Sequence, residues 1–142
     1  MAERYDPNNI FAKILRGTIP CHKVFDDEVA LAFMDIMPRC EGHCLVIPKA
    51  PARTLLDIAP DTLAELIRRV QLVGRAAVTA MDADGLTLQQ FSEAAGGQEV
   101  FHLHFHILPR KSGVALRPPA GPMADAGLLK TQAEKIRTAI GG

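Results

Sequence analysis

The chain has 142 residues, and its 16 basic and 16 acidic side chains leave a formal net charge of zero. This length is most simply one domain over residues 1–142, and the zero charge argues against a general nucleic-acid or membrane-surface binder. No apolar run approaches the ~20 residues of a membrane span, so we expect no membrane partner. Three cysteines without zinc-ribbon spacing, in a chain without an apolar N-terminal signal segment, favour free thiols in a cytoplasmic protein.

The first part of the chain predicts a short helix followed by three strands. Residues 1–8 form a loose lead-in, and the folded core is expected over residues 9–112. Asn8 or Asn9 can cap a helix that Gly17 ends. The strands are expected over residues 22–25, 29–34 and 44–47, of which the first two form a hairpin and the third stops at Pro48.

The clearest helix starts near Pro60 and runs to about Met81, with Asp61 and Glu65 near the positive end of its dipole. Its apolar residues recur at helical spacing and predict one buried stripe: Leu63, Leu66, Ile67, Val70, Val73, Ala77, Val78 and Met81. Strands over 86–91 and 100–108 follow, and then a C-terminal arm over 113–142 that closes with a helix over 125–140. Because strands and helices do not strictly alternate, we expect an α+β fold, in which the long helix packs on an antiparallel sheet of about five strands.

The most informative segment places three of the five histidines at every second position: His102, His104 and His106. The flanking and intervening residues are all apolar. Side chains of a strand alternate between its two faces, so the apolar residues are expected to face the core and the three imidazoles the opposite side. A solvated face more often carries lysine, glutamate or threonine, and this pattern therefore indicates chemistry.

The spacing of these imidazoles suits a phosphate group better than a metal ion. Neighbouring histidines on one strand face lie roughly 6.6 Å apart, and the outer two roughly 13 Å. Three ligands on one ion would be strained, since metal–nitrogen distances are ~2.0–2.1 Å, although two could share an ion with a ligand from elsewhere. A neutral imidazole can attack phosphorus, and a charged neighbour can stabilise the phosphoryl oxygens. Gly96 and Gly97 allow close backbone approach to an anion, and Gln98 adds an amide donor.

Residues 96–110 resemble the signature of the histidine triad (HIT) superfamily, which is His-x-His-x-His flanked by apolar residues after a Gly-Gln turn. Residues 9–14, 32–36 and 42–49 resemble its other blocks, so the likeness covers about residues 8–112. The whole is most similar to the Hint-like branch, and Pro109-Arg110-Lys111 is also similar to the Fhit-like branch. The resemblance implies a HIT-like fold and a homodimer whose sheet extends across a two-fold axis.

The resemblance also implies a mechanism. His104 would be the nucleophile on the α-phosphate of a nucleotide, and water would hydrolyse the covalent nucleotidyl-histidine. His106 would contact the phosphate oxygens. His102 would help to orient the nucleophile together with His43, which lies in a Gly-His-x-Leu-Val-x-Pro block. No cofactor is implied.

The remaining site residues would bind the substrate. Asp35 would accept hydrogen bonds from the ribose hydroxyls. An apolar slot would hold the base, and it comprises Ile10, Phe11, Phe33, Ile36 and Leu45. Ordinary core packing is the competing interpretation of these five residues. Gly97 and Gln98 belong to the phosphate turn. Glu99 stands where the Hint-like branch commonly has serine or threonine. The family often has an amide side chain near the position that Phe91 occupies in this chain. Gln89 can supply that amide instead.

The leading hypothesis is a hydrolase that cleaves purine nucleoside phosphoramidates or related AMP or GMP conjugates and releases a nucleoside monophosphate. The alternatives are a diadenosine polyphosphate hydrolase, a nucleotide-binding regulator with negligible turnover, and a metal-binding histidine protein. Asn9 and Ala12 occupy positions at which a zinc-binding subgroup has cysteine, so we expect no structural zinc. The tail from Lys111 to Gly142 follows the histidine strand directly and is expected to reach a partner subunit's site.

Overall fold

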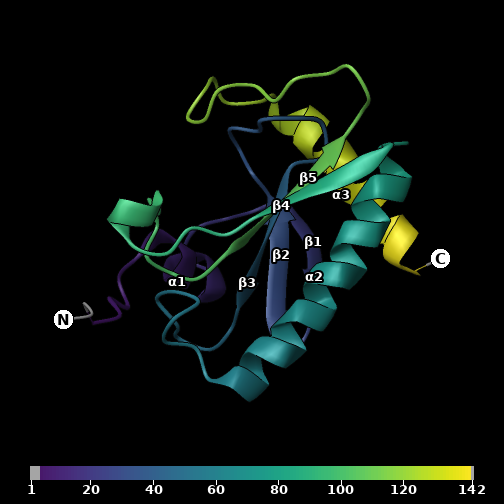
Figure 1. Cartoon of the computed structure of the whole chain (residues 1–142). Coiled ribbons are helices and arrows are strands. Elements are labelled where there is room, and N and C mark those ends of the chain that lie inside the picture. Colours follow the sequence, from purple (N-terminus) through teal and green to yellow (C-terminus); the bar gives the residue numbers. More distant parts are fainter. Residues whose placement is uncertain (1–3, 142) are drawn as a thin grey trace.

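The computed structural model describes residues 4–141, which form one five-stranded antiparallel sheet with helices on both faces (Figure 1). The strand order is β1-β2-β3-β5-β4. In chain order the elements are α1 (Ile10–Leu15), β1 (Lys23–Asp26), β2 (Ala30–Met34), β3 (Cys44–Pro48), α2 (Pro60–Ala80), β4 (Gly85–Gln89), the 3₁₀ helix η1 (Ala94–Gly96), β5 (Phe105–Arg110) and α3 (Ala126–Gly141). The predicted α+β fold is confirmed.

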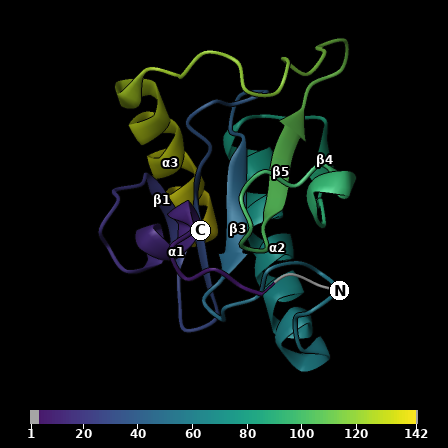
Figure 2. The same ribbon diagram turned by 90° about the vertical axis from the view of Figure 1, so that its left-hand side faces the viewer.

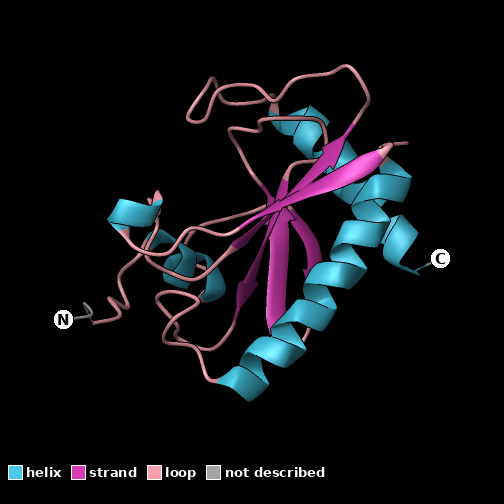
Figure 3. Ribbon diagram, in the orientation of Figure 1, coloured by secondary structure: helices cyan, strands magenta, loops and turns pink. Residues whose placement is uncertain are grey.

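The sheet separates two apolar clusters, because β2 and β3 are buried on both faces. Helices α2 and α3 cover one face, and α1 and η1 lie on the other (Figure 3). Alternate residues of β2 and β3 point to the larger cluster under α2 and α3, which includes Ala32, Met34 and Val46. The smaller cluster on the α1 side comprises Phe11, Leu31, Phe33, Leu45 and Ile47. Period-two alternation therefore assigns each strand residue to one layer.

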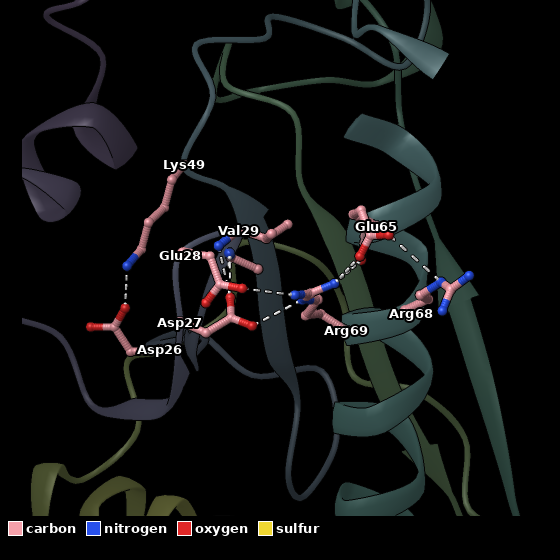
Figure 4. A network of polar contacts seen from close by, with 9 residues as sticks. Asp26, Asp27, Glu28, Val29, Lys49, Glu65, Arg68 and Arg69 are labelled. Atoms are coloured by element: carbon pink, nitrogen blue, oxygen red, sulfur yellow. Dashed lines mark hydrogen bonds and ion pairs between the residues drawn. The ribbon is translucent and has the colours of Figure 1, made fainter. Parts of the chain in front are cut away.

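Most of the predicted stripe on α2 is buried, including Leu66, Val70 and Val73. The prediction for Ile67 is wrong, because this side chain is 41% exposed. Each helical residue turns ~100° from the one before it, so Ile67 lies at the solvent side of Leu66. A polar network ties α2 to the β1–β2 turn, as Figure 4 shows. Arg69 Nε donates to Asp27 Oδ2 at 2.9 Å, and Arg69 Nη1 donates to Glu65 Oε2 at 2.6 Å.

The histidine segment differs from the predicted continuous strand. Strand β5 begins only at Phe105, and β4 ends at Gln89, so Phe91 lies outside the sheet. Leu103 N instead donates to Ala52 O in a loop, at 2.9 Å. Leu103, Phe105 and Ile107 still lie in the larger cluster, as predicted, but burial does not alternate, because His102 and His104 are buried as well. Strand β5 also extends through Pro109, although proline has no N–H to donate. Beyond Ile107, β5 pairs with β4 alone, so no hydrogen bond to β3 is needed there.

The expected C-terminal helix is present as α3, which packs against α2 and β1. The part of the C-terminal arm that precedes α3, residues 113–125, has no regular structure and runs past the end of the sheet (Figure 2). Within the described residues, no helix has both the length and the apolar character to cross a membrane. All three cysteines are free thiols, as predicted.

Candidate active site

A cavity of about 420 Å³ opens on the α1 side of the sheet. It brings together every residue of the predicted site except His102 and Gln98. The predicted residues that line it are Ile10, Phe11, Phe33, Asp35, Ile36, His43, Leu45, Gln89, Gly97, Glu99, His104 and His106. Residues far apart in the sequence thus converge because α1, the ends of β2, β3 and β4, and the histidine segment meet on one face.

One end of the cavity is apolar. Asn9 caps α1 by accepting a hydrogen bond from Ala12 N at 2.9 Å, which fixes the helix beside the sheet. The rings of Phe11 and Phe33 pack edge to face, with centroids 5.4 Å apart. Ile10 and Ile36 are 47% and 46% exposed, although both line the cavity. Their exposure favours a lined slot over ordinary core packing at these two positions.

His104 is held in the tautomer that a nucleophile needs. Its Nδ1 lies 2.7 Å from the backbone oxygen of His102. A carbonyl oxygen can only accept, so Nδ1 carries the proton and Nε2 keeps a free electron pair. The rings of Phe11 and His104 pack edge to face, and burial lowers the pKa of His104 below its usual value. At neutral pH the ring is therefore uncharged.

The tautomers of His43 and His106 follow in the same way. Arg39 N donates to His43 Nδ1 at 3.0 Å, so His43 Nε2 carries the proton and donates to His106 Nδ1, also at 3.0 Å. His106 then has its proton on Nε2, where it can donate to an anion. Burial, followed by the neighbouring His106 and Arg39, lowers the pKa of His43 to about 3.

The expectation of charged neighbours beside the nucleophile is wrong for this arrangement. Burial, with the charges of His104 and Arg39 as smaller causes, lowers the pKa of His106 to about 4. Burial also lowers the pKa of His102 to about 4. These rings are neutral at pH 7, and they can stabilise phosphoryl oxygens through N–H dipoles but not through a full charge.

His102 does not line the cavity, and its ring is fully buried. Nε2 donates to Pro48 O at 2.8 Å, and Nδ1 lies 2.6 Å from the hydroxyl of Tyr5. Its link to the His104 ring is its own backbone carbonyl, which His104 Nδ1 contacts. The predicted orienting role therefore has a physical route, through the main chain.

Asp35 lies beside this histidine cluster. Its Oδ1 accepts from Met37 N at 2.8 Å, and Oδ2 lies 3.5 Å from His43 Nε2. Burial raises the pKa of this carboxyl. Asp35, His43 and His106 each offer a ligand atom within 4.8 Å of the others, which is the one such group found among residues 4–141. The hydrogen bond between the two imidazoles already occupies a nitrogen of each, and the absence of a resident metal stays a prediction.

The Gly96–Gln98 turn is built differently from the prediction. Gly97 has a φ of +98°, which favours glycine, and a Cβ there would lie 3.3 Å from the Phe91 ring. Gln98 was expected to donate to a ligand, but its side chain turns into the protein and is 4% exposed. Its Oε1 accepts from Glu93 N at 2.7 Å, and Nε2 donates to the backbone oxygens of Arg53 and Val100. Gln98 thus braces the turn.

Sequence reasoning missed Arg53, which supports the same turn. Its guanidinium forms a two-pronged ion pair with Glu93, at 2.8 and 2.9 Å, and lies 4.2 Å from the ring centroid of Phe101. Glu93 has a φ of +66°, which non-glycine residues rarely adopt. No local pattern around Arg53 indicates this partnership, which spans 40 positions of the sequence.

The C-terminal arm completes the cavity wall with Pro119 and Ala120. Its Arg117 N donates to Arg39 O at 2.7 Å, while Arg39 Nε donates to Arg117 O at 2.8 Å. The structure therefore places this part of the tail at its own chain's site, and contact with a partner subunit's site stays a prediction. Arg39, which sequence reasoning also missed, is the one lysine or arginine that lines the cavity in the described part of the chain.

The lowered histidine pKa values predict a pH dependence of stability. In the unfolded chain these imidazoles titrate near ~6.5, whereas His43 does so at about 3 and His102 and His106 at about 4 in the fold. At pH values between the pKa of the folded state and that of the unfolded state, the unfolded chain binds more protons than the folded one. The free energy of unfolding must therefore fall as pH drops from 6.5 towards 4. Urea unfolding should show at least about 1 kcal/mol less stability at pH 5.0 than at pH 7.5. Equal stability at the two pH values would contradict the burial of neutral rings.

The site combines an imidazole nitrogen with a free electron pair at His104, an imidazole N–H at His106 in the same cavity, and the buried imidazole of His102. These three rings define a histidine-triad protein. Comparison with known sequences agrees. A model of the HIT domain family matches residues 16–113, which is more than half of the chain, and the protein belongs to this family.

Relatives with named activities are among the similar proteins. The chain is 40% identical over 102 residues to "Adenylylsulfatase HINT3" of Arabidopsis thaliana, a match that covers 72% of this chain and 52% of that protein, or about half its length. It is 32% identical over 134 residues to "Adenosine 5'-monophosphoramidase hnt1" of Schizosaccharomyces pombe, covering 92% of this chain and 97% of the relative. A crystal structure of a HIT-like protein from Bartonella henselae, described as involved in cell-cycle regulation and as holding an unknown ligand, superposes with a TM-score of 0.92. It is 48% identical, over 96% of this chain and 99% of that one.

Proposed function

We propose that the protein is a nucleotide hydrolase that cleaves purine nucleoside phosphoramidates, or related nucleotide conjugates, at the α-phosphate. His104 Nε2 attacks phosphorus, the bond to the leaving group breaks, and the leaving group departs with the electron pair and takes up a proton from solvent. Water then attacks the same phosphorus, the bond between Nε2 and phosphorus breaks, one proton of the water returns to solvent, and His104 regains its neutral form. The products are a nucleoside monophosphate and the free leaving group.

The observation that carries this proposal is the state of His104. Its Nδ1 proton is committed to the His102 carbonyl, which leaves an uncharged Nε2 on a ring that lines the cavity. His106 offers an N–H for the developing charge, and the Gly97 backbone lies in the same wall. The apolar slot at Phe11 and Phe33 suits a flat base, and Asp35 suits a vicinal diol as an acceptor.

The names of two relatives support cleavage at an adenylyl phosphorus. One is named for adenylyl sulfate and the other for an adenosine phosphoramidate, so their names share the nucleoside phosphate and differ in the leaving group. Chemistry at His104 requires only that shared part. We therefore propose AMP or GMP conjugates as substrates and rank a P–N linked leaving group first.

The test is product analysis with defined substrates. Adenosine 5′-phosphoramidate, adenylyl sulfate and diadenosine triphosphate are each incubated with the protein, and nucleotide products are separated by chromatography. Release of AMP, fastest from the phosphoramidate, is the expected result. Faster cleavage of diadenosine triphosphate would favour the polyphosphate hydrolase instead. Tight AMP binding with no product over hours from any substrate would overturn hydrolysis and favour a regulator.

We also propose a homodimer in which two sheets join across a two-fold axis. Strand β4 is at one edge of the sheet, and its Leu86 and Leu88 are 43% and 46% exposed. An open edge strand with exposed leucines offers both backbone partners and apolar area to a second copy. Sedimentation should give twice the chain mass, and Leu88→Glu should shift it towards the monomer. A monomeric wild-type protein would contradict the proposal.

The three free thiols, of which Cys40 and Cys44 are buried, support a reducing compartment. We therefore propose that the protein acts in the cytoplasm.

A further inference from the structure

The lead-in to α1 carries the chain's one tyrosine, and its hydroxyl reaches the histidine cluster. Tyr5 Oη lies 2.6 Å from His102 Nδ1, and the two rings pack edge to face with centroids 5.5 Å apart. This contact joins positions 97 residues apart, and Tyr5 precedes the segment that matches the family. Neither the motif nor the comparisons give it a role.

The direction of the hydrogen bond follows from the other side of the His102 ring. Nε2 lies 2.8 Å from Pro48 O, which only accepts, so Nε2 carries the proton. A neutral ring then has an unprotonated Nδ1, and the Tyr5 hydroxyl must donate to it. Tyr5 and Pro48 thus clamp a fully buried imidazole from both sides in a single tautomer.

The clamp reaches the nucleophile through the backbone of the same residue. His104 Nδ1 donates to His102 O at 2.7 Å, and this bond sets both the orientation of the His104 ring and the nitrogen that stays unprotonated. We propose that Tyr5 is a positioning residue for His104, acting through the His102 ring and carbonyl. This inference rests on the proposed function in that His104 is taken as the nucleophile.

The lead-in has its own attachments, which allow the hydroxyl to be tested separately. Arg16 Nη1 donates to Pro7 O at 2.7 Å, and Asn9 N donates to Asp6 O at 3.2 Å. Replacing Arg16 by glutamine loosens the lead-in without touching His102. Replacing Tyr5 by phenylalanine keeps the ring contact and removes only the hydrogen bond.

The kinetic experiment compares Tyr5→Phe and Arg16→Gln with the wild type on adenosine 5′-phosphoramidate. Tyr5→Phe should lower kcat about tenfold, because small misplacement of a reacting group is costly, while KM stays within about twofold. Arg16→Gln should retain the wild-type kcat. An unchanged kcat in Tyr5→Phe would overturn the proposal, and so would an equal loss in both variants, because it would show that only the anchoring of the lead-in matters.

A second measurement needs no turnover and so separates this inference from the proposed function. Nitrogen-15 NMR of the imidazoles should show His102 protonated at Nε2 in the wild type, with His104 protonated at Nδ1. In Tyr5→Phe the His102 signals should shift towards a mixture of tautomers, and His104 should lose its single Nδ1–H state. Unchanged tautomers of both rings would overturn the positioning role, whether or not the wild type proves to be a hydrolase.

Discussion

Replacing His104 by alanine should lower kcat at least about 10³-fold and leave the affinity for AMP within a few-fold. Among the residues that the structure describes, Nε2 of His104 is the one ring nitrogen at the cavity for which the geometry fixes a free electron pair. The base slot and Asp35 lie on other elements, so nucleotide binding should survive. Steady-state AMP release gives kcat, and calorimetric titration with AMP gives the affinity.

Trapping of the intermediate makes this prediction specific to the mechanism. Wild-type protein quenched during turnover of a labelled phosphoramidate should carry labelled nucleotide, and the alanine variant should carry none. His22 provides a matched control, because it lies outside the cavity, and His22→Ala should react like the wild type. A His104→Ala variant that keeps more than a tenth of the wild-type kcat would show that another group attacks phosphorus.

The sequence was sufficient for the layers of this fold because local patterns determine them. Alternation in β2 and β3, the stripe on α2 and the cap at Asn9 each depend on neighbours within a few residues. The site residues with a motif, such as His104 and Asp35, were placed at the cavity for the same reason. Burial of the imidazoles, and hence their neutrality, could not be predicted, since it depends on how distant residues such as Tyr5 and Phe11 pack against the rings.

The supporting contacts escaped prediction because they join distant parts of the chain without a local signal. Tyr5 meets His102, Arg53 meets Glu93, and Arg39 meets Arg117 only after folding. Polar residues at each of these positions would be equally compatible with an exposed loop. Such contacts decide which tautomer or backbone angle a motif residue adopts, so a motif fixes the reacting groups and the rest of the fold fixes their state.

Replacing Gln98 by leucine should reduce the free energy of unfolding by about 2–4 kcal/mol, because it strips partners from three backbone groups at a buried position. A donor that served a bound phosphate would instead leave stability unchanged. Gln89→Leu is the matched control, since Gln89 lines the cavity and makes no side-chain hydrogen bond among the described residues. Thermal unfolding should therefore move by several degrees for Gln98→Leu and hardly at all for Gln89→Leu.

Steady-state kinetics should also distinguish the two glutamines, because one variant should change kcat and the other KM. Gln98→Leu releases the Gly96–Gln98 turn, so kcat should fall along with stability, and cooling well below the unfolding transition should recover part of it. Gln89→Leu should change KM at constant stability, because its side chain is available to the substrate. Wild-type stability in Gln98→Leu together with a raised KM would mean that the amide leaves its backbone partners to bind the ligand, and the sequence-based role would then hold after all.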